Sequence, residues 1–92
     1  MSRDALLDAL GTDDLHELER TVTAILQLPV SSSDPDVLFA AGRACEDKLL
    51  DPGRAVALYD RVVAEHPTAR VAIVATRHAA ALREQIGPHG ET

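Results

Sequence analysis

Glycine and proline divide this chain into five short segments, and within each segment apolar residues recur at intervals of three and four positions. The dividing residues are Gly11, Pro29, the pair Asp51-Pro52, Pro67 and the pair Gly87-Pro88. Intervals of three and four place apolar side chains on one side of an α-helix, whereas a strand requires strict alternation. The sequence therefore predicts an all-α fold of about five helices.

The expected helices cover residues 2–10, 13–28, 34–50, 52–66 and 69–86. Asp34-Pro35 and Asp51-Pro52 predict the starts of the third and fourth helices, because aspartate caps a helix and proline suits its first turn. Gly87-Pro88 should end the fifth helix, so that residues 87–92 form a frayed polar tail. A chain of 92 residues fits one small domain, spanning residues 1–92.

A more specific pattern lies within residues 35–67. Its members are spaced as Leu38-x-x-Ala41-Gly42-x-x-Cys45, followed by Ala55-x-x-x-Tyr59-x-x-Val62-x-x-x-x-Pro67. This spacing resembles one tetratricopeptide repeat, in which two antiparallel helices approach at small residues and larger apolar side chains fill the space between them. The resemblance places Gly42 and Ala55 at the close approach and Pro67 at the end of the repeat.

Gly42 and Ala55 are one residue farther apart than in the usual repeat, and this departure falls in the turn at residues 50–52. The resemblance implies that residues 1–29 form a degenerate helix pair and that residues 68–86 form a capping helix. The helical hairpins would then pack either as a short tetratricopeptide-like solenoid or as a compact bundle.

The resemblance also implies a binding scaffold, acting as an adaptor or regulatory subunit for a partner protein or peptide. It places a partner-binding groove on the inner side of the third and fifth helices, formed by Phe39, Arg43, Glu46, Val74 and His78. An aromatic anchor beside an arginine suits peptide recognition, because both residue types are enriched at interface hot spots. Alternatively, Phe39 fills the core by covering the first or second helix.

Self-association is the second interpretation. Of the apolar residues, 15 are alanines, so the buried area per residue is modest and a second copy of the chain would add to a thin core. In this alternative the protein is a homodimeric helical bundle, and its twin occupies the groove.

No arrangement of side chains typical of an enzyme or a metal site is found in the sequence. His16, His66, His78 and His89 do not form a metal-binding motif, and no phosphate loop or activated nucleophile is present. Cys45 is the single cysteine and lies at an apolar helical position, where a buried thiol is expected. We therefore expect no catalytic residues, no bound metal and no cofactor.

The net charge of −6 argues against a nucleic-acid partner, which requires clustered lysine and arginine. Residues 1–46 contain nine acidic and three basic residues, whereas the remainder contains six of each. The acidic half is either a surface for a basic partner or a solubilising surface, and we expect it to pair with arginines of the second half or of a second copy. Those arginines are Arg54, Arg61, Arg70 and Arg77.

No run of about 20 apolar residues is present that would cross a bilayer, and the first residues lead into a charged helix. The sequence therefore predicts a cytoplasmic protein without a membrane partner.

Overall fold

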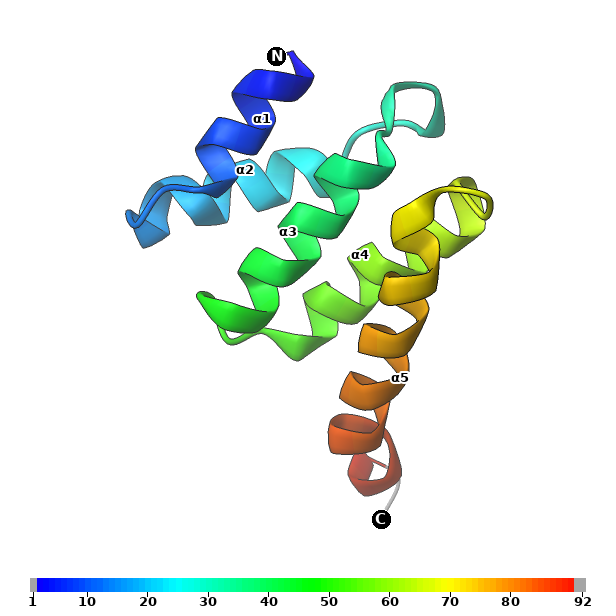
Figure 1. The fold of residues 1–92 in the computed structure, drawn as a ribbon. Coiled ribbons are helices and arrows are strands. Elements are labelled where there is room, and N and C mark those ends of the chain that lie inside the picture. The colour runs from blue at the N-terminus through cyan, green and yellow to red at the C-terminus, as the bar shows by residue number, and fades with distance from the viewer. Residues whose placement is uncertain (1, 91–92) are drawn as a thin grey trace.

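The computed structural model describes residues 2–90, which form five α-helices and one short 3-10 helix (Figure 1). No strand occurs among these residues, so the all-α prediction is confirmed. The elements are α1 (Arg3–Leu10), α2 (Leu15–Leu26), η1 (Val30–Ser32), α3 (Pro35–Asp47), α4 (Pro52–Glu65) and α5 (Arg70–Gly90).

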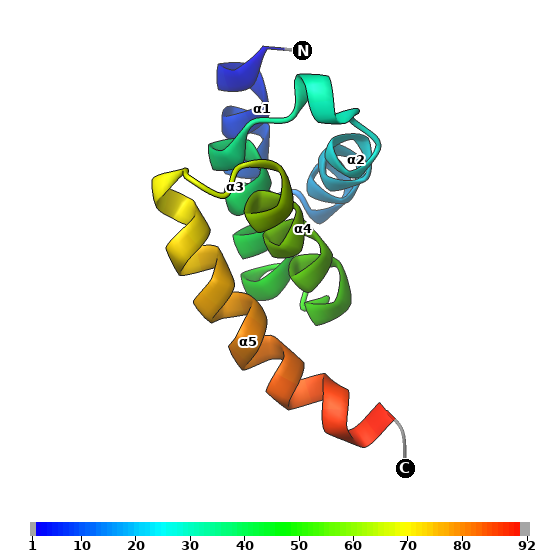
Figure 2. The same ribbon diagram turned by 90° about the vertical axis from the view of Figure 1, so that its right-hand side faces the viewer.

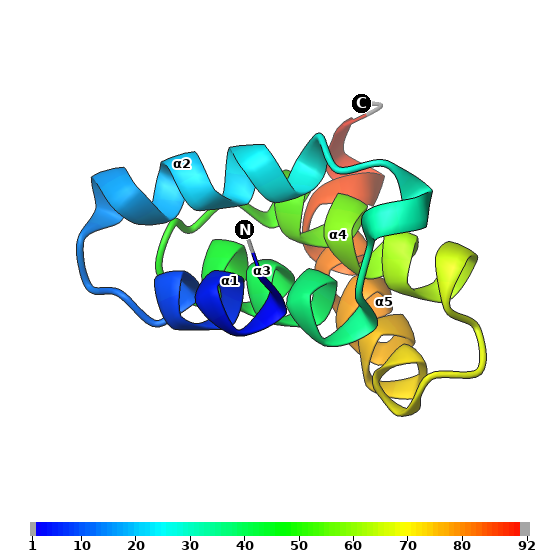
Figure 3. The same cartoon turned by 90° about the horizontal axis from the view of Figure 1, so that it is seen from above.

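The helices form two layers. Seen from above, α1 and α3 lie on one side and α2 and α4 on the other, while α5 begins on the side of α1 and α3 and crosses toward the side of α2 and α4 (Figure 3). The first four helices thus alternate between the layers, and the closest packing is between α3 and α4 and between α4 and α5. The smallest dimension of the molecule is 19 Å, which matches two helices of about 10 Å diameter stacked on each other.

Side-chain caps fix where the helices begin. At α1, the Ser2 hydroxyl accepts a hydrogen bond from the Ala5 amide. At α2, α3 and α4, the carboxylates of Asp14, Asp34 and Asp51 accept hydrogen bonds from backbone amides in the same way. Each cap satisfies a donor that the helix leaves unpaired at its first turn. The predicted starts at Asp34 and Asp51 are therefore confirmed.

All five helices contribute side chains to a single core. Leu6 and Leu10 of α1 belong to it, together with Leu18, Val22 and Ile25 of α2. From α5 the core receives small residues and one leucine, which allows this helix to approach α4 closely. The α5 members are Ala72, Ala75, Ala79 and Leu82.

The residues that carry the repeat resemblance are packing residues in this fold. All of them are buried except Pro67, which lies exposed between α4 and α5. Gly42 faces the ring of Tyr59, and a Cβ at this glycine would lie only 2.5 Å from Cε1 of that ring. The expected close approach of α3 to α4 is present at Gly42, with the Tyr59 ring covering it.

Two predicted helix ends are wrong. Helix α3 ends at Asp47 instead of residue 50, and Leu50 adopts a left-handed conformation with φ of 52°. The Asp51 amide donates to the Cys45 carbonyl at 2.8 Å, which closes the turn around Leu50. The additional residue between Gly42 and Ala55 is thus absorbed by a tight turn, although Leu49 and Leu50 continue the apolar pattern of the helix.

The fifth helix continues to Gly90, past the expected end at Gly87-Pro88. Proline disfavours helical geometry in the preceding residue by a clash with its Cβ and amide, and here that residue is a glycine, which has no Cβ. Residues 87–90 are therefore helical, and the remainder of the predicted frayed tail, residues 91–92, lies outside the described residues.

Candidate functional site

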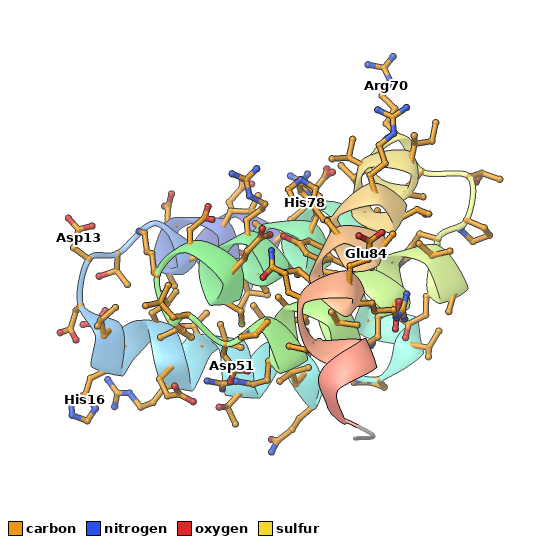
Figure 4. The ribbon with its side chains drawn as sticks, turned by 90° about the horizontal axis from the view of Figure 1, so that it is seen from below. Asp13, His16, Asp51, Arg70, His78 and Glu84 are labelled. Atoms are coloured by element: carbon orange, nitrogen blue, oxygen red, sulfur yellow. The ribbon has the colours of Figure 1, made fainter. Side chains whose placement is uncertain are left out.

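Three of the five predicted partner-binding residues come together where α3 meets α5. They are Phe39, Glu46 and His78, and they surround Tyr59 of α4. The ring of Phe39 lies 5.6 Å from the ring of Tyr59 and 5.8 Å from that of His78, measured between centroids. The Tyr59 and His78 rings are 5.3 Å apart. His78 is labelled on α5 in Figure 4, near its contact with α3. These spacings are typical of packed aromatic side chains.

Glu46 joins this cluster through its carboxylate. Its Oε1 accepts a hydrogen bond of 2.8 Å from the Tyr59 hydroxyl and lies 3.1 Å from Nδ1 of His78. Burial raises the pKa of Tyr59, and its hydrogen bond to Glu46 raises it further, so the hydroxyl remains a donor. Glu46 and His78 therefore connect α3, α4 and α5 inside the protein, as well as bordering the surface.

An open hollow of about 410 Å³ lies between α1 and α3. Its lining is apolar at the base and charged at the rim: Leu7, Leu10, Gly11, Phe39, Ala40, Arg43, Ala44, Asp47 and Lys48. Phe39 thus belongs to both regions, since it is half-buried against Tyr59 and also lines the hollow. The two alternatives for Phe39, exposed anchor or core residue, each describe part of its position.

The rim of the hollow carries two cations with free hydrogen-bonding capacity. Nη2 of Arg43 lies 3.2 Å from Asp47, and this arginine side chain is 48% exposed. Nζ of Lys48 donates to the Thr12 carbonyl at 3.0 Å and lies 3.7 Å from Asp13. Arg43 therefore engages one nitrogen and keeps the rest of its guanidinium open to a ligand.

Val74 does not belong to this arrangement. It lies one turn before His78 on α5, is 40% exposed, and is absent from the apolar residues that pack against the core. Leu7, Leu10, Ala40 and Ala44 line the hollow but are not among the predicted site residues. The repeat resemblance begins at residue 35, so it contains no signal for the two leucines on α1.

A larger hollow, of about 570 Å³, lies between α1, α2 and η1. Its one basic side chain, Arg3, is already bound by Asp34 at 3.0 Å and by Asp36. Because these two carboxylates occupy Arg3, this hollow offers less to a charged ligand than the smaller one between α1 and α3.

The predicted pairing of arginines with the acidic half holds for Arg54, whose Nη2 lies 2.8 Å from Glu19. Hydrogen bonding from Arg54 lowers the pKa of Glu19. Arg61 instead donates to backbone carbonyls of α2 and its following turn, including Leu28 at 3.0 Å. Arg70 and Arg77 form no ion pair with another described side chain.

The remaining reactive side chains lie apart. Within the described part of the chain, no three histidine, cysteine, aspartate or glutamate side chains are placed to hold a metal ion. His66 Nε2 lies 2.8 Å from the Ser33 hydroxyl, and Cys45 is fully buried. Burial raises the pKa of the Cys45 thiol to about 11, which disfavours the reactive thiolate.

No helix among the described residues is long and apolar enough to cross a membrane. The chain matches no protein-family model, no curated protein and no solved structure. The tetratricopeptide resemblance therefore depends on the spacing within residues 35–67 alone, and an inference about function depends on the geometry of the surface.

Proposed function

We propose that this protein is a non-catalytic binding module that holds a partner protein or peptide over the hollow between α1 and α3. The observation that carries the proposal is that Phe39 belongs to both the aromatic cluster and the hollow. Its ring packs against the rings of Tyr59 and His78, while the residue also lines the hollow. A rigidly held aromatic side chain contributes contact area at little entropic cost when a partner binds.

The lining defines the chemistry of the partner. The base is formed by Leu7, Leu10, Ala40 and Ala44, which suit an apolar side chain. Arg43 at the rim can grip a carboxylate with two nitrogens, and Lys48 adds a second positive charge beside it. The fitting ligand is a segment that carries an apolar residue next to an acidic residue.

The two-layer arrangement supports the same proposal. Helices α1 and α3 lie side by side in one layer, and the groove between two such neighbouring helices can receive an elongated ligand (Figure 3). Under this proposal the protein serves as an adaptor or regulatory subunit in the cytoplasm, and neither catalysis nor a cofactor is part of its role.

A pull-down tests the proposal: the protein is immobilised, a cell extract is passed over it, and the retained proteins are identified by mass spectrometry. The informative variants are Ala40→Glu, which fills the hollow, and Arg43→Glu, which reverses the charge of the rim. Ala57→Glu and Arg20→Glu are matched controls, because Ala57 and Arg20 are exposed on α4 and α2 of the other layer. Circular dichroism establishes that all four variants are folded.

We expect a partner that wild type and both controls retain and that both hollow variants lose. Isothermal titration with a peptide from that partner should then give weaker affinity for Ala40→Glu than for Ala57→Glu. Equal retention by all five proteins would contradict the proposal, since the hollow would then contribute nothing to binding.

A further inference from the structure

Helix α5 leaves one complete face open to solvent along the edge of the molecule (Figure 2). Residues on this face recur at intervals of three and four, opposite the buried Ala75 and Ala79. The face consists of Arg70, Ile73, Val74, Arg77, Ala80, Ala81 and Glu84, all of them exposed. Ile73 is 65% exposed and Val74 40%, so two adjacent large apolar side chains meet solvent on this face, and a contiguous apolar surface is typical of a protein interaction site.

Residues at equal distances before and after Arg77 on this face are complementary in charge or in size, so the face can pair with a copy of itself that runs in the opposite direction. Arg70 and Glu84 lie seven residues to either side of Arg77, and neither forms an ion pair with another described side chain. Between them, the large pair Ile73-Val74 precedes Arg77 and the small pair Ala80-Ala81 follows it. Figure 4 shows Arg70 projecting away from the rest of the protein at the beginning of α5, and Glu84 further along the same helix.

We infer that this face binds a second copy of the chain, with the two α5 helices antiparallel and related by a twofold axis near Arg77. In this arrangement Ile73 and Val74 of one copy face Ala80 and Ala81 of the other. The small residues let the helices approach while the large ones fill the space. The same symmetry brings Arg70 of each copy to Glu84 of the other, which forms two equivalent ion pairs.

The expected association is reversible and weak. A single pair of helices buries less than the roughly 1,200 Å² that marks the lower end of stable interfaces. At the axis, Arg77 of one copy lies near Arg77 of the other. The long aliphatic part of each arginine can cover the apolar pairs while its guanidinium stays in water. We therefore expect a dissociation constant in roughly the micromolar range.

This inference is independent of the proposed function, because the open face of α5 lies away from the hollow between α1 and α3. It assigns Val74 to a self-association surface instead of the partner-binding groove. A variant in the hollow, Ala40→Glu, should leave self-association unchanged, and a variant on α5 should leave partner binding unchanged. Failure of one proposal is therefore distinguishable from failure of the other.

Sedimentation equilibrium over a wide concentration range tests the inference through a charge exchange. Arg70→Glu alone and Glu84→Arg alone should each weaken dimerisation about tenfold, because each places like charges together at two symmetric positions. The double variant Arg70→Glu, Glu84→Arg should recover wild-type association. Within one chain these residues lie roughly 21 Å apart along the helix, so the recovery can arise only between copies.

Two controls complete the experiment. Arg20→Glu makes the same change of charge on an exposed position of α2 and should not affect the dimer, whereas Ile73→Glu should abolish it. A wild-type protein that stays monomeric at every concentration would overturn the inference. So would a double variant that associates no better than the single variants, or a dimer that survives Ile73→Glu but is lost in Ala40→Glu.

Discussion

Gly42 illustrates how one residue decides the distance between two helices. The ring of Tyr59 lies so close that a Cβ at this position would be 2.5 Å from Cε1 and 2.8 Å from Cδ1. The ring has little freedom to retreat, because its hydroxyl is bound to Glu46 and the ring packs against Phe39 and His78. Glycine is required here for lack of space, with no demand for an unusual backbone angle.

Gly42→Ala should therefore lower the free energy of unfolding by about 1–3 kcal/mol, the usual cost of overpacking a rigid core. Gly53→Ala is the matched control, because a Cβ at Gly53 meets only Asp51 Oδ1 at 3.6 Å. That control should raise stability by up to about 1 kcal/mol through the better helix propensity of alanine. Urea unfolding followed by circular dichroism measures both changes, and equal effects would show that Tyr59 yields to the added methyl group.

Leu50 is the opposite case, since here the backbone angle matters and the side chain does not. Its φ is 52° and its side chain is 76% exposed, so the residue bears the strain of the left-handed conformation without a compensating contact. Leu50→Gly should raise the free energy of unfolding by roughly 0.5–1 kcal/mol relative to Leu50→Ala. Both variants remove the exposed side chain, so their difference in thermal midpoint isolates the backbone effect. A midpoint that is the same in both variants would contradict the strain at this turn.

Arg61 joins α4 to the end of α2. Its Nη1 lies 3.3 Å from the Ile25 and Leu26 carbonyls, and its Nη2 lies 3.0 Å from that of Leu28. These carbonyls lie at the end of α2, where the helix supplies too few partners of its own, so the guanidinium acts as a cap supplied by another element. Glu65 holds the arginine in place through Nε at 2.7 Å and Nη2 at 3.1 Å.

The hydrogen bonds from Arg61 hold the pKa of Glu65 below its ordinary value of 4.5, with a smaller contribution from Ser33. A carboxylate with a lowered pKa in the folded state stabilises the protein above its unfolded pKa, and this contribution is lost as the pH falls through the folded value. Glu65→Gln should therefore cost about 1–2 kcal/mol at neutral pH, and the difference from wild type should shrink below about pH 4.5. Urea unfolding at a series of pH values measures this difference.

The Arg61→Ala background provides the control for this pH dependence. Without the guanidinium, Glu65→Gln should have a small effect that does not change with pH. If the cost of Glu65→Gln kept the same pH dependence in that background, another group would have to be responsible for holding the carboxylate.

The periodicity of the sequence predicted the helices and most of the core, because the burial of one helical face depends on local spacing. It did not predict the hollow between α1 and α3, since the position of α1 on the layer depends on packing between Leu6, Leu10 and residues distant in sequence. The repeat register predicts that Phe39, Glu46 and His78 lie together, and they do. It assigns their shared partner Tyr59 to packing alone, because a spacing pattern contains no information about where the tyrosine hydroxyl points.

The stability of the whole molecule depends on α5. This helix buries Ala72, Ala75, Ala79 and Leu82, a contribution of roughly 5 kcal/mol that is comparable to the whole stability of a small domain. Its removal also takes His78 away from Glu46 and uncovers the Tyr59 ring. A chain shortened to residues 1–69 should therefore lose cooperative thermal unfolding. A chain of residues 1–86 retains every described core residue and should unfold close to the wild-type midpoint. Cooperative unfolding of the shorter chain would show that the four preceding helices form a sufficient core by themselves.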